Sequence, residues 1–428
     1  MAGNRYDVLV VGAGIVGLSC AYHIKQAHPE LSVLIIDRGA AAGQGDTAKS
    51  NAALRDTFTS TVNRTLARST IEFYKHVQFE LGFNLNLDMV GYLWLLSPKQ
   101  AEDFGAVESD MRKQGTRFRT YDVNELTKMI PDLTPQPESQ QSNLMGLQRV
   151  EKGLFGIDCG TMASELIVRF YENELRRLGA EFQFLTDATA LDLAARKSLG
   201  LPGEPFVWQE KLFRRVETAR GPVAADTIVL AAGIRNPLLL DPVGVDCMIK
   251  PRKNQLFQLR APSIQRLLDT RGFNELGTIP FTILPNGEVY LRPVTRESSV
   301  WVGAVAGLGR PFRLEEDPAA EENFYTGNVY PVLSEYFPCF TNLRPTNMWA
   351  GFYDVNSLDA TPIVTRVENC IIVGGMSGSG IMKADAVGRI AAAIFDDKDE
   401  ATLYGDRTIR ASQVGLVNRD VETEKLVI

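Results

Sequence analysis

The sequence predicts an α/β fold in which a parallel sheet is assembled from separated parts of the chain. Three stretches support this prediction: residues 7–37, 224–233 and 370–395. In each of them a short apolar run, typical of a buried parallel strand, leads into glycine or other small residues. The ranges 89–150 and 236–343 contain short runs typical of antiparallel strands. We therefore expect an α/β domain made of discontinuous segments and a second domain dominated by antiparallel sheet, so that the whole chain is α+β.

The first stretch has the order of a dinucleotide-binding unit. The apolar run 7–11 precedes Gly12-Ala13-Gly14-Ile15-Val16-Gly17, helical spacing begins at Leu18, and a second run, 32–36, ends at Asp37. The glycines allow a tight turn, close approach of the backbone to a pyrophosphate and close helix packing, and the acid accepts hydrogen bonds from ribose hydroxyls. The helix N-terminus adds unpaired N–H groups and a positive dipole. The expected cofactor contacts are Gly12, Gly14, Ile15, Val16, Gly17, Asp37 and Arg38, of which Asp37 disfavours a 2′-phosphate and Arg38 weakens that argument.

The segment that follows is rich in small and polar residues. An extended chain of this kind, here residues 43–55, can pass a large planar ligand and offer N–H and hydroxyl groups to its phosphate and ribityl oxygens. An ordinary loop of turn-forming residues is the alternative. Under the first interpretation the cofactor contacts are Gly45, Asp46, Lys49, Ser50, Asn51 and Ala52.

The two later stretches have the same character. The strand predicted at 224–230 ends in small residues, and the strand at 370–373 runs into a turn with four glycines at 374–380 before a helix over 384–395. Four glycines in so short a turn exceed what a simple strand–helix connection requires. The expected cofactor contacts are Ala232, Gly233, Gly375, Gly378, Ser379, Gly380, Ile381, Met382 and Lys383.

The composition excludes several functional classes. The chain has 428 residues, 45 Lys and Arg against 52 Asp and Glu, and a formal charge of −7, which offers no basic surface to nucleic acid. Five scattered cysteines without a CxxC pair, and only three histidines, indicate neither a disulfide framework nor a metal site. No apolar run has the length of a membrane span, and a strand-like run that begins by residue 6 leaves no room for a signal peptide. We expect a cytoplasmic protein and leave peripheral membrane attachment and homo-oligomerisation open.

Together the three stretches resemble the FAD-dependent D-amino-acid oxidase superfamily, in the branch that holds glycine oxidase, sarcosine oxidase and dye-linked proline dehydrogenase. Several segments are similar to dye-linked L-proline dehydrogenase in particular: 45–64, 309–318, 378–383, 403–405 and 424–426. The resemblance covers nearly the whole chain. It implies a Rossmann-like FAD-binding domain and a substrate domain over the isoalloxazine.

The domain ranges follow from this pattern together with the predicted elements. The FAD-binding domain is expected from 1–88, 151–235 and 344–428, and the substrate-binding domain from 89–150 and 236–343. Further predicted elements are strands at 91–96, 255–259, 289–292 and 300–305, a hairpin turn at 284–288, a helix over 158–178 and a loop at 199–205.

The resemblance also implies a site for an amino acid beside the flavin. A substrate carboxylate requires one or two cations, for which Lys383, Arg292 and Arg55 are the candidates. Solvated surface cations are the alternative for each of them. Tyr353 and Tyr290 match aromatic positions that line the pocket, and plain core packing is the alternative for both.

Two departures from the relatives suggest how the flavin is held and reoxidised. Relatives with covalent flavin have a cysteine where this chain has Gly351, so we expect noncovalent FAD. When the sequences are compared without gaps, Trp301 occupies the position at which sarcosine-oxidase-like relatives have an oxygen-activating lysine. Without that cation, electron transfer to oxygen should be slow. The tail that ends Leu426-Val427-Ile428 is expected to dock on the body or near the pocket mouth.

The leading hypothesis is therefore FAD-dependent oxidation of L-proline to 1-pyrroline-5-carboxylate. A hydride equivalent passes from the substrate to the flavin, and the electrons continue to a quinone or an artificial dye. A glycine- or sarcosine-type oxidase that forms hydrogen peroxide is one alternative. A flavin-binding subunit that is catalytically silent outside a larger complex is another.

Overall fold

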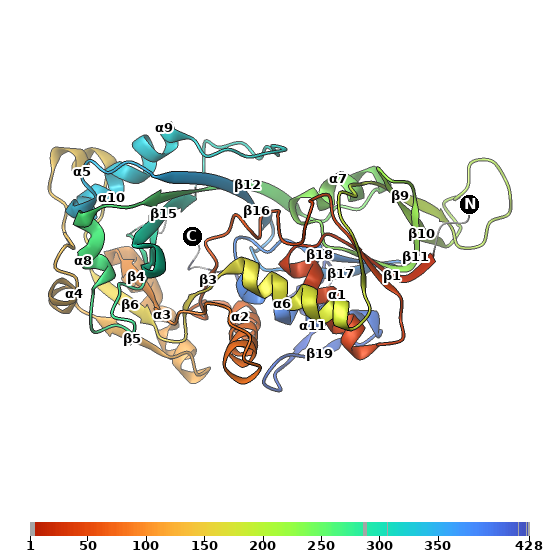
Figure 1. Ribbon diagram of the computed structural model, residues 1–428, viewed down its shortest axis with the longest axis horizontal. Helices are drawn as coiled ribbons and strands as arrows, with labels where there is room; N and C mark the ends of the chain where they lie inside the picture. Colours follow the sequence, from red (N-terminus) through yellow and green to blue (C-terminus); the bar gives the residue numbers. More distant parts are fainter. Residues whose placement is uncertain (1–4, 286–288, 306, 418, 425, 427–428) are drawn as a thin grey trace.

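Two eight-stranded sheets lie one after the other along the longest axis of the computed structural model (Figure 1). The structure describes residues 5–285, 289–305, 307–417, 419–424 and 426. The expected hairpin turn at 284–288 therefore lies largely outside the described residues. Among the described residues, no helix is long and apolar enough to cross a bilayer.

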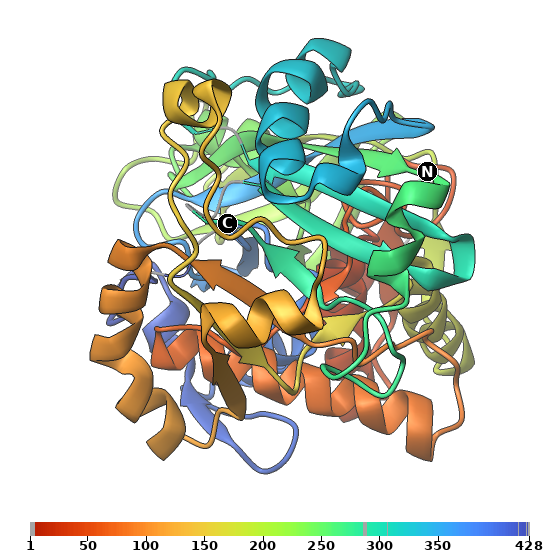
Figure 2. The same cartoon turned by 90° about the vertical axis from the view of Figure 1, so that its left-hand side faces the viewer.

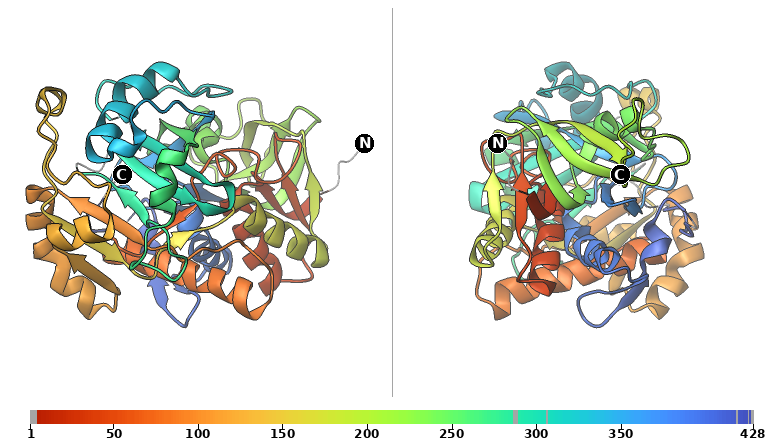
Figure 3. Two further views of the ribbon diagram at one scale, coloured as in Figure 1. Left: turned by 60° about the vertical axis from the view of Figure 1, so that its left-hand side comes forward. Right: turned by 90° about the vertical axis from the view of Figure 1, so that its right-hand side faces the viewer.

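The first sheet brings the three glycine-rich stretches together as neighbouring strands, which confirms the α/β prediction. The centre of this sheet is parallel. The strands predicted in the three stretches lie side by side there, in the order β18, β11, β1 and β2. Helices α1 and α11 pack against each other beside it (Figure 1), and a ribbon of β9 and β10 continues from β11 (Figure 3). The strands in sheet order are β17 (Ile363–Val367), β18 (Cys370–Gly374), β11 (Val223–Leu230), β1 (Arg5–Val11), β2 (Val33–Ile36) and β8 (Glu181–Gln183), with β9 (Ala188–Ala195) and β10 (Lys211–Thr218) attached, and the helices are α1 (Ile15–Ala27), α6 (Ser164–Arg177) and α11 (Ala384–Phe395).

Two glycines of the fingerprint are required by backbone contacts. A Cβ on Gly12, whose φ is +108°, would lie 2.4 Å from the carbonyl oxygen of Ala231. A Cβ on Gly17 would lie 2.0 Å from the carbonyl oxygen of Gly12. Helix α1 therefore starts in direct backbone contact with the strand ends, and its N-terminus is fixed at the edge where β1, β2 and β11 finish.

The second sheet is antiparallel except for β13 and β4, among the pairs that the structure describes. One face carries Phe257, Leu291 and Val302 against Leu333 and Tyr336, in the segment with α9 and α10 that Figure 2 shows in light blue above the strands. The opposite face looks toward the first domain. In sheet order the strands are β16 (Asn347–Asn356), β12 (Ile249–Leu259), β15 (Ser299–Val305), β14 (Val289–Val294), β13 (Phe281–Ile283), β4 (Tyr92–Leu96), β6 (Lys152–Gly156) and β5 (Phe118–Tyr121).

The remaining elements connect these layers. They are β3 (Ala53–Leu54), α2 (Thr61–Lys75), α3 (Pro98–Lys113), α4 (Val123–Met129), α5 (Gln140–Met145), β7 (Gly160–Thr161), α7 (Asn236–Leu240), α8 (Gln265–Leu268), α9 (Glu322–Phe324), α10 (Tyr330–Tyr336), β19 (Glu400–Thr402) and β20 (Thr408–Arg410).

Three strands and one helix differ from the sequence-based ranges. β6 and β16 pair within the second sheet, although the ranges 151–235 and 344–428 were expected in the FAD-binding domain. Their partners, β4 and β12, are distant in sequence, so no local pattern indicates this pairing. The helix expected over 158–178 begins only at Ser164. The preceding residues form β7, where a Cβ on Gly160 would meet the carbonyl oxygen of Asp88 at 2.3 Å.

The contact between α1 and α11 gives a test of the packing. A Cβ on Gly388 would lie 2.2 Å from Ser19 Oγ and 2.7 Å from the Ser19 backbone. We expect Gly388→Ala to lower the free energy of unfolding by about 1–3 kcal/mol, the usual cost of overpacking. Gly105→Ala is the matched control, because Gly105 is an exposed helical glycine with open space around it. It should be neutral or stabilising by up to about 1 kcal/mol. Equal denaturation midpoints for the two variants would contradict the packing assigned to α11.

Candidate active site

A cavity of about 490 Å³ lies where the carboxyl ends of the parallel strands meet β16. Its walls come from all three glycine-rich stretches and from the segment after Asp37. The residues expected to contact the cofactor that line it are Gly12, Gly14, Ile15, Val16, Asp37, Arg38, Gly45, Asp46, Lys49, Ser50, Ala232, Gly233, Gly378, Gly380 and Ile381. The other expected contacts, Gly17, Asn51, Ala52, Gly375, Ser379, Met382 and Lys383, are not among the lining residues.

The cavity has the chemistry that a dinucleotide requires. Asp37 accepts hydrogen bonds from the backbone N–H groups of Ala13 and Gly39, both at 2.7 Å, which fixes its carboxylate at the end of β2. The N-terminus of α1 opens into the cavity beside Gly14. A Cβ at Gly45 or Gly233 would have open space around it, so bare backbone is available to a ligand there. These groups fit a pyrophosphate at the helix terminus and a ribose at the acid.

A loop from the second domain closes over this cavity. Glu316 pairs with Arg38 at 3.1 Å and also with Arg235, and all three line the cavity. Glu315, next to it, pairs with Lys253 at 3.0 Å. The sequence indicated this segment only through the resemblance. No local pattern reveals that its acids meet arginines that lie far away in sequence.

Two half-buried acids hold the wall together on the side of β16. Asp46 accepts a hydrogen bond from the Phe352 backbone N–H at 2.8 Å, and burial raises its pKa. Asp354 accepts from the backbone amides of Met376 and Gly375, and burial raises its pKa to about 7. Sequence reasoning did not assign Asp354 a role. An acid within the mostly apolar run 348–355 was the available signal.

Two cations lie side by side in a buried aromatic environment. Lys383 Nζ lies 4.7 Å from the centre of the Phe58 ring, and Arg55 Cζ lies 3.8 Å from the same centre. Lys383 donates to Asn63 Oδ1 at 2.7 Å, and Arg55 donates to the Thr57 carbonyl at 2.6 Å. Burial, followed by the charge of Arg55, lowers the pKa of Lys383 to about 7. Neither cation has a carboxylate within 4 Å among the residues that the structure describes.

The C-terminal tail reaches this pair. Glu424 accepts hydrogen bonds from the Thr59 N–H and hydroxyl, the Ser60 N–H and the Leu426 N–H, at 2.8–3.0 Å. The Leu426 carbonyl accepts from Arg55 at 2.6 Å, and its side chain is buried. Leu426 therefore docks in the protein, as the sequence suggested for the tail. Val427 and Ile428 lie outside the described residues.

The two tyrosines of the expected substrate site lie next to each other, Tyr290 buried and Tyr353 half-buried. Arg292 makes different contacts from the other two cations. The hydroxyls of Tyr290 and Tyr353 interact, and Tyr290 also donates to Asn254 Oδ1 at 3.1 Å. Tyr353 lines the cofactor cavity and packs on Gly378, where a Cβ would lie 2.6 Å from its ring. Arg292 donates to the backbone carbonyls of Asn51 and Met162, and burial lowers its pKa to about 10.

Gly351 occupies a crowded position at the cavity wall. A Cβ there would lie 2.9 Å from the Lys49 Cβ and 3.2 Å from Asp46 Oδ1. None of the five cysteines lines the described part of the cavity. Noncovalent attachment therefore remains the expectation for the flavin.

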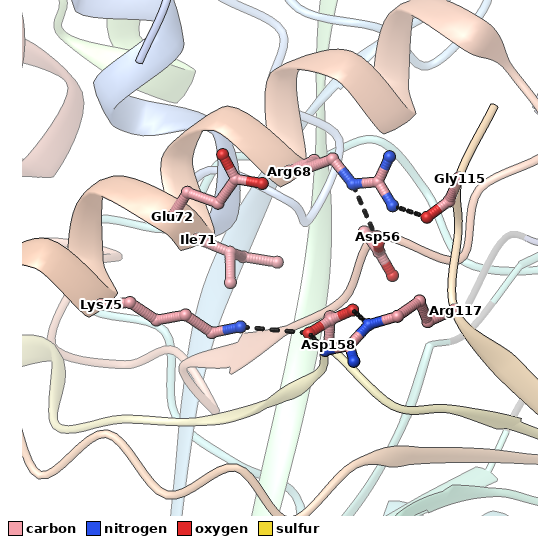
Figure 4. Close-up of a pocket in the computed structure, with 8 residues that line it drawn as sticks. All are labelled: Asp56, Arg68, Ile71, Glu72, Lys75, Gly115, Arg117 and Asp158. Carbon is pink, nitrogen blue, oxygen red and sulfur yellow. Dashed lines mark hydrogen bonds and ion pairs between the residues drawn. The ribbon is translucent and has the colours of Figure 1, made fainter. Parts of the chain in front are cut away.

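A second cavity, of about 290 Å³, lies beside helix α2 (Figure 4). Asp158 pairs there with Lys75 at 3.2 Å and with Arg117 at 2.5 Å, while Asp56 Oδ2 lies 3.6 Å from Arg68 Nε. Burial raises the pKa of Asp56 to about 6. Each cation in this cavity lies within 4 Å of a carboxylate, which is the difference from Arg55 and Lys383.

Comparison with known proteins agrees with this geometry. The fold superposes on the crystal structure of L-proline dehydrogenase from P. horikoshii with a TM-score of 0.72 at 20% identity, over 92% of this chain and 94% of that chain. It superposes on glycine oxidase from Geobacillus kaustophilus with a TM-score of 0.69 at 17% identity, over 92% and 95% of the two chains. In sequence the chain is 25% identical over 419 residues to FAD-dependent oxidoreductase domain-containing protein 1 of Bos taurus. This alignment spans 91% of this chain and 81% of the relative.

A family profile also matches most of the chain. The profile described as FAD dependent oxidoreductase (DAO) matches residues 7–394. This range includes the fingerprint of β1 and α1, the strand β11, and the turn before α11 that carries Lys383. The chain therefore belongs to the DAO family of FAD-dependent oxidoreductases, and FAD is its cofactor.

Proposed function

We propose that this protein oxidises L-proline to 1-pyrroline-5-carboxylate and passes the electrons to an acceptor other than oxygen. One observation carries the substrate class. Lys383 and Arg55 are buried on one aromatic ring without a carboxylate partner among the described residues. Buried cations are normally paired. A free carboxylate of a small substrate would supply the missing partner.

The chain's own residues bind and orient the substrate in this proposal. Arg55 offers a planar fork of donors and Lys383 a single charge to the carboxylate. Tyr353 and Tyr290 give flat walls suited to a pyrrolidine ring. FAD, when bound, accepts the hydride equivalent and carries the redox chemistry. Loss of hydrogen from C5 and the nitrogen gives 1-pyrroline-5-carboxylate, whereas loss from Cα and the nitrogen gives the 2-carboxylate isomer.

Two further observations support proline over the alternatives. The P. horikoshii structure with the TM-score of 0.72 is that of an L-proline dehydrogenase. Trp301, with its ring 4.6 Å from Arg292 Cζ, stands where oxidases are expected to have a lysine that promotes oxygen reduction. An indole offers no such charge to developing superoxide. A glycine-type oxidase remains the second candidate, because glycine oxidase from Geobacillus kaustophilus shares the fold.

The direct test is an acceptor assay on the purified holoenzyme with proline, sarcosine and glycine. We expect L-proline to reduce an artificial dye and to bleach the flavin anaerobically, with little hydrogen peroxide formed in air. The product should react as 1-pyrroline-5-carboxylate and not as its 2-carboxylate isomer. Peroxide from glycine or sarcosine, with no dye reduction by proline, would favour the oxidase. No bleaching by any small amine would favour a silent flavin subunit.

Removal of the Lys383 charge tests the carboxylate site. We expect Lys383→Met to raise the KM for proline about 10- to 100-fold, the range for a charged hydrogen bond worth about 1.5–3 kcal/mol. Lys25→Met is the matched control. Like Lys383, Lys25 is buried, and among the described residues it donates to the backbone carbonyls of Pro29 and Leu31. It lies in α1, outside the proposed carboxylate site. An equal change of KM in both variants would count against the assignment.

The lowered pKa of Lys383 gives a pH test. Tetrahydro-2-furoate has the ring and carboxylate of proline but no titratable amine. Because the pKa of Lys383 is about 7 in the free protein, the lysine loses its charge as the pH rises above that value. The Kd should therefore increase between pH 6 and 9, by at most about tenfold per pH unit. Calorimetric titration of the wild type and Lys383→Met measures this. A Kd of the wild type that does not change with pH contradicts this assignment of Lys383. A Kd that changes with pH in the wild type but not in Lys383→Met supports it.

A further inference from the structure

We propose that a groove around Trp301 and Trp349 binds the electron acceptor, and that this acceptor is a planar quinone. The inference rests on the proposed function, since it names the acceptor for the same flavin. The groove has a volume of about 640 Å³ and is open to solvent. Its residues that matter here are Lys49, Gln258, Arg260, Trp301, Asn347 and Trp349, and we call it the tryptophan groove.

The groove continues the wall of the cofactor cavity. In the second sheet Trp349 pairs with Leu256, and two residues along these strands Gly351 pairs with Asn254. Side chains two residues apart share a face of a sheet, so Trp349 lies on the face that carries Asn254 and Gly351 into the cofactor cavity. Lys49 lines both the cavity and the groove. The groove and the cofactor cavity therefore share Lys49 as a common wall.

The groove presents a rigid aromatic surface. The indoles of Trp301 and Trp349 meet edge to face, with centroids 4.8 Å apart and planes at 83°. Trp349 is held by a hydrogen bond from Nε1 to the Lys49 carbonyl at 3.1 Å. The Arg292 guanidinium lies 4.6 Å from the centre of the Trp301 ring on the neighbouring strand. A flat conjugated ligand gains most from such a surface, because ring stacking depends on planarity.

The polar groups of the groove suit carbonyl oxygens. Arg260 is half exposed and lies 3.6 Å from Glu297, and Lys49 Nζ lies 3.8 Å from the fully exposed Asp317. At these separations neither cation makes a short hydrogen bond to its acid. Both can donate to an acceptor oxygen, and positive charge stabilises the negative charge that a quinone gains on reduction. Trp301 Nε1 is buried and has no hydrogen-bond partner among the described residues.

The overall reaction balances without a further reactant. Oxidation of the amine to the imine breaks one C–H and one N–H bond and releases two electrons and two protons. The quinone takes up these two electrons and two protons at its oxygens and becomes the hydroquinone. The flavin returns to its oxidised form after each cycle.

Binding is tested separately from turnover by tryptophan fluorescence. The chain has four tryptophans, and Trp208 is 72% exposed on a distant loop. Holoenzyme carrying Trp208→Phe is therefore the parent, so that collisional quenching at the surface is reduced. We expect ubiquinone-1 to quench its emission saturably. Arg260→Gln should raise the Kd about tenfold, as expected for loss of a hydrogen bond to a charged group.

The kinetic arm uses the same proteins. Arg260→Gln should raise the KM for ubiquinone-1 by a similar factor and leave the rate of anaerobic bleaching by proline unchanged. Trp301→Leu should also weaken quinone binding. Arg266→Gln is the matched control, because Arg266 is an exposed arginine of the same domain, paired with Asp132 at 3.3 Å.

The outcomes separate the two proposals. Quinone binding that responds to Arg260→Gln, without bleaching by proline, supports the groove and contradicts the proposed substrate. Bleaching by proline with linear quenching, or with a Kd unchanged in both Arg260→Gln and Trp301→Leu, overturns the groove and leaves the substrate standing. Electron transfer to a protein acceptor alone, with no quinone bound, also overturns it.

Discussion

The close backbone contact between the start of α1 and the ends of β1 and β11 is the constraint on which the rest of the site depends. Gly12 and Gly17 allow it, since a Cβ on either would collide with a carbonyl oxygen. The contact aims the N-terminus of α1 at the cavity and brings Ala231 under the first turn. Asp37 then lies close enough to bind the Ala13 N–H. The helix dipole suited to a phosphate, the acid suited to a ribose and the strand ends thereby converge on one place.

Strand β16 connects this arrangement to the second domain. Within four residues it supplies the backbone N–H that binds Asp46, the tyrosine against Gly378 and the acid that binds the amides of Gly375 and Met376. Its other edge is paired with β12 along ten residues. Part of the cofactor cavity and the expected substrate residue Tyr353 are therefore carried by the same strand. A shift of the second sheet would displace both together, which favours a fixed distance between cofactor and substrate.

The fold was predictable where its signals are local. The strand, turn, helix and terminal acid of residues 7–37 lie within one short stretch, and the match to the DAO family confirms the FAD-dependent class. The placement of β6 and β16 was not predictable, because their partner strands lie about 60 and about 100 residues away and neither carries a distinguishing pattern. The predicted start of the helix at 158–178 was too early for a similar reason, since the helix begins at Ser164. Its apolar spacing is real, but Gly160 is required by a distant carbonyl of Asp88.

The site was predictable in part. The resemblance identified Lys383 and Arg55 as candidates, but their position on one ring depends on Phe58 and on the path of the tail. The acids of the loop over the cavity, and Asp354, make contacts that only the folded chain defines. The resemblance also grouped Arg292 with these cations. In the structure Arg292 donates to the backbone carbonyls of Asn51 and Met162, and its role in substrate binding stays a prediction.

The pairing of Glu316 with Arg38 and Arg235 has a practical consequence for handling the protein. These side chains cover the cofactor cavity, yet Glu316 is 73% exposed, so dissolved ions compete with the pairs that it forms. Concentrated salt weakens this closure while the buried strands and glycine contacts beneath it stay intact. Dialysis against a chaotropic halide therefore offers a route to the apoprotein without global denaturation. Reconstitution with flavins of altered redox potential would then allow the driving force of each half-reaction to be varied one at a time.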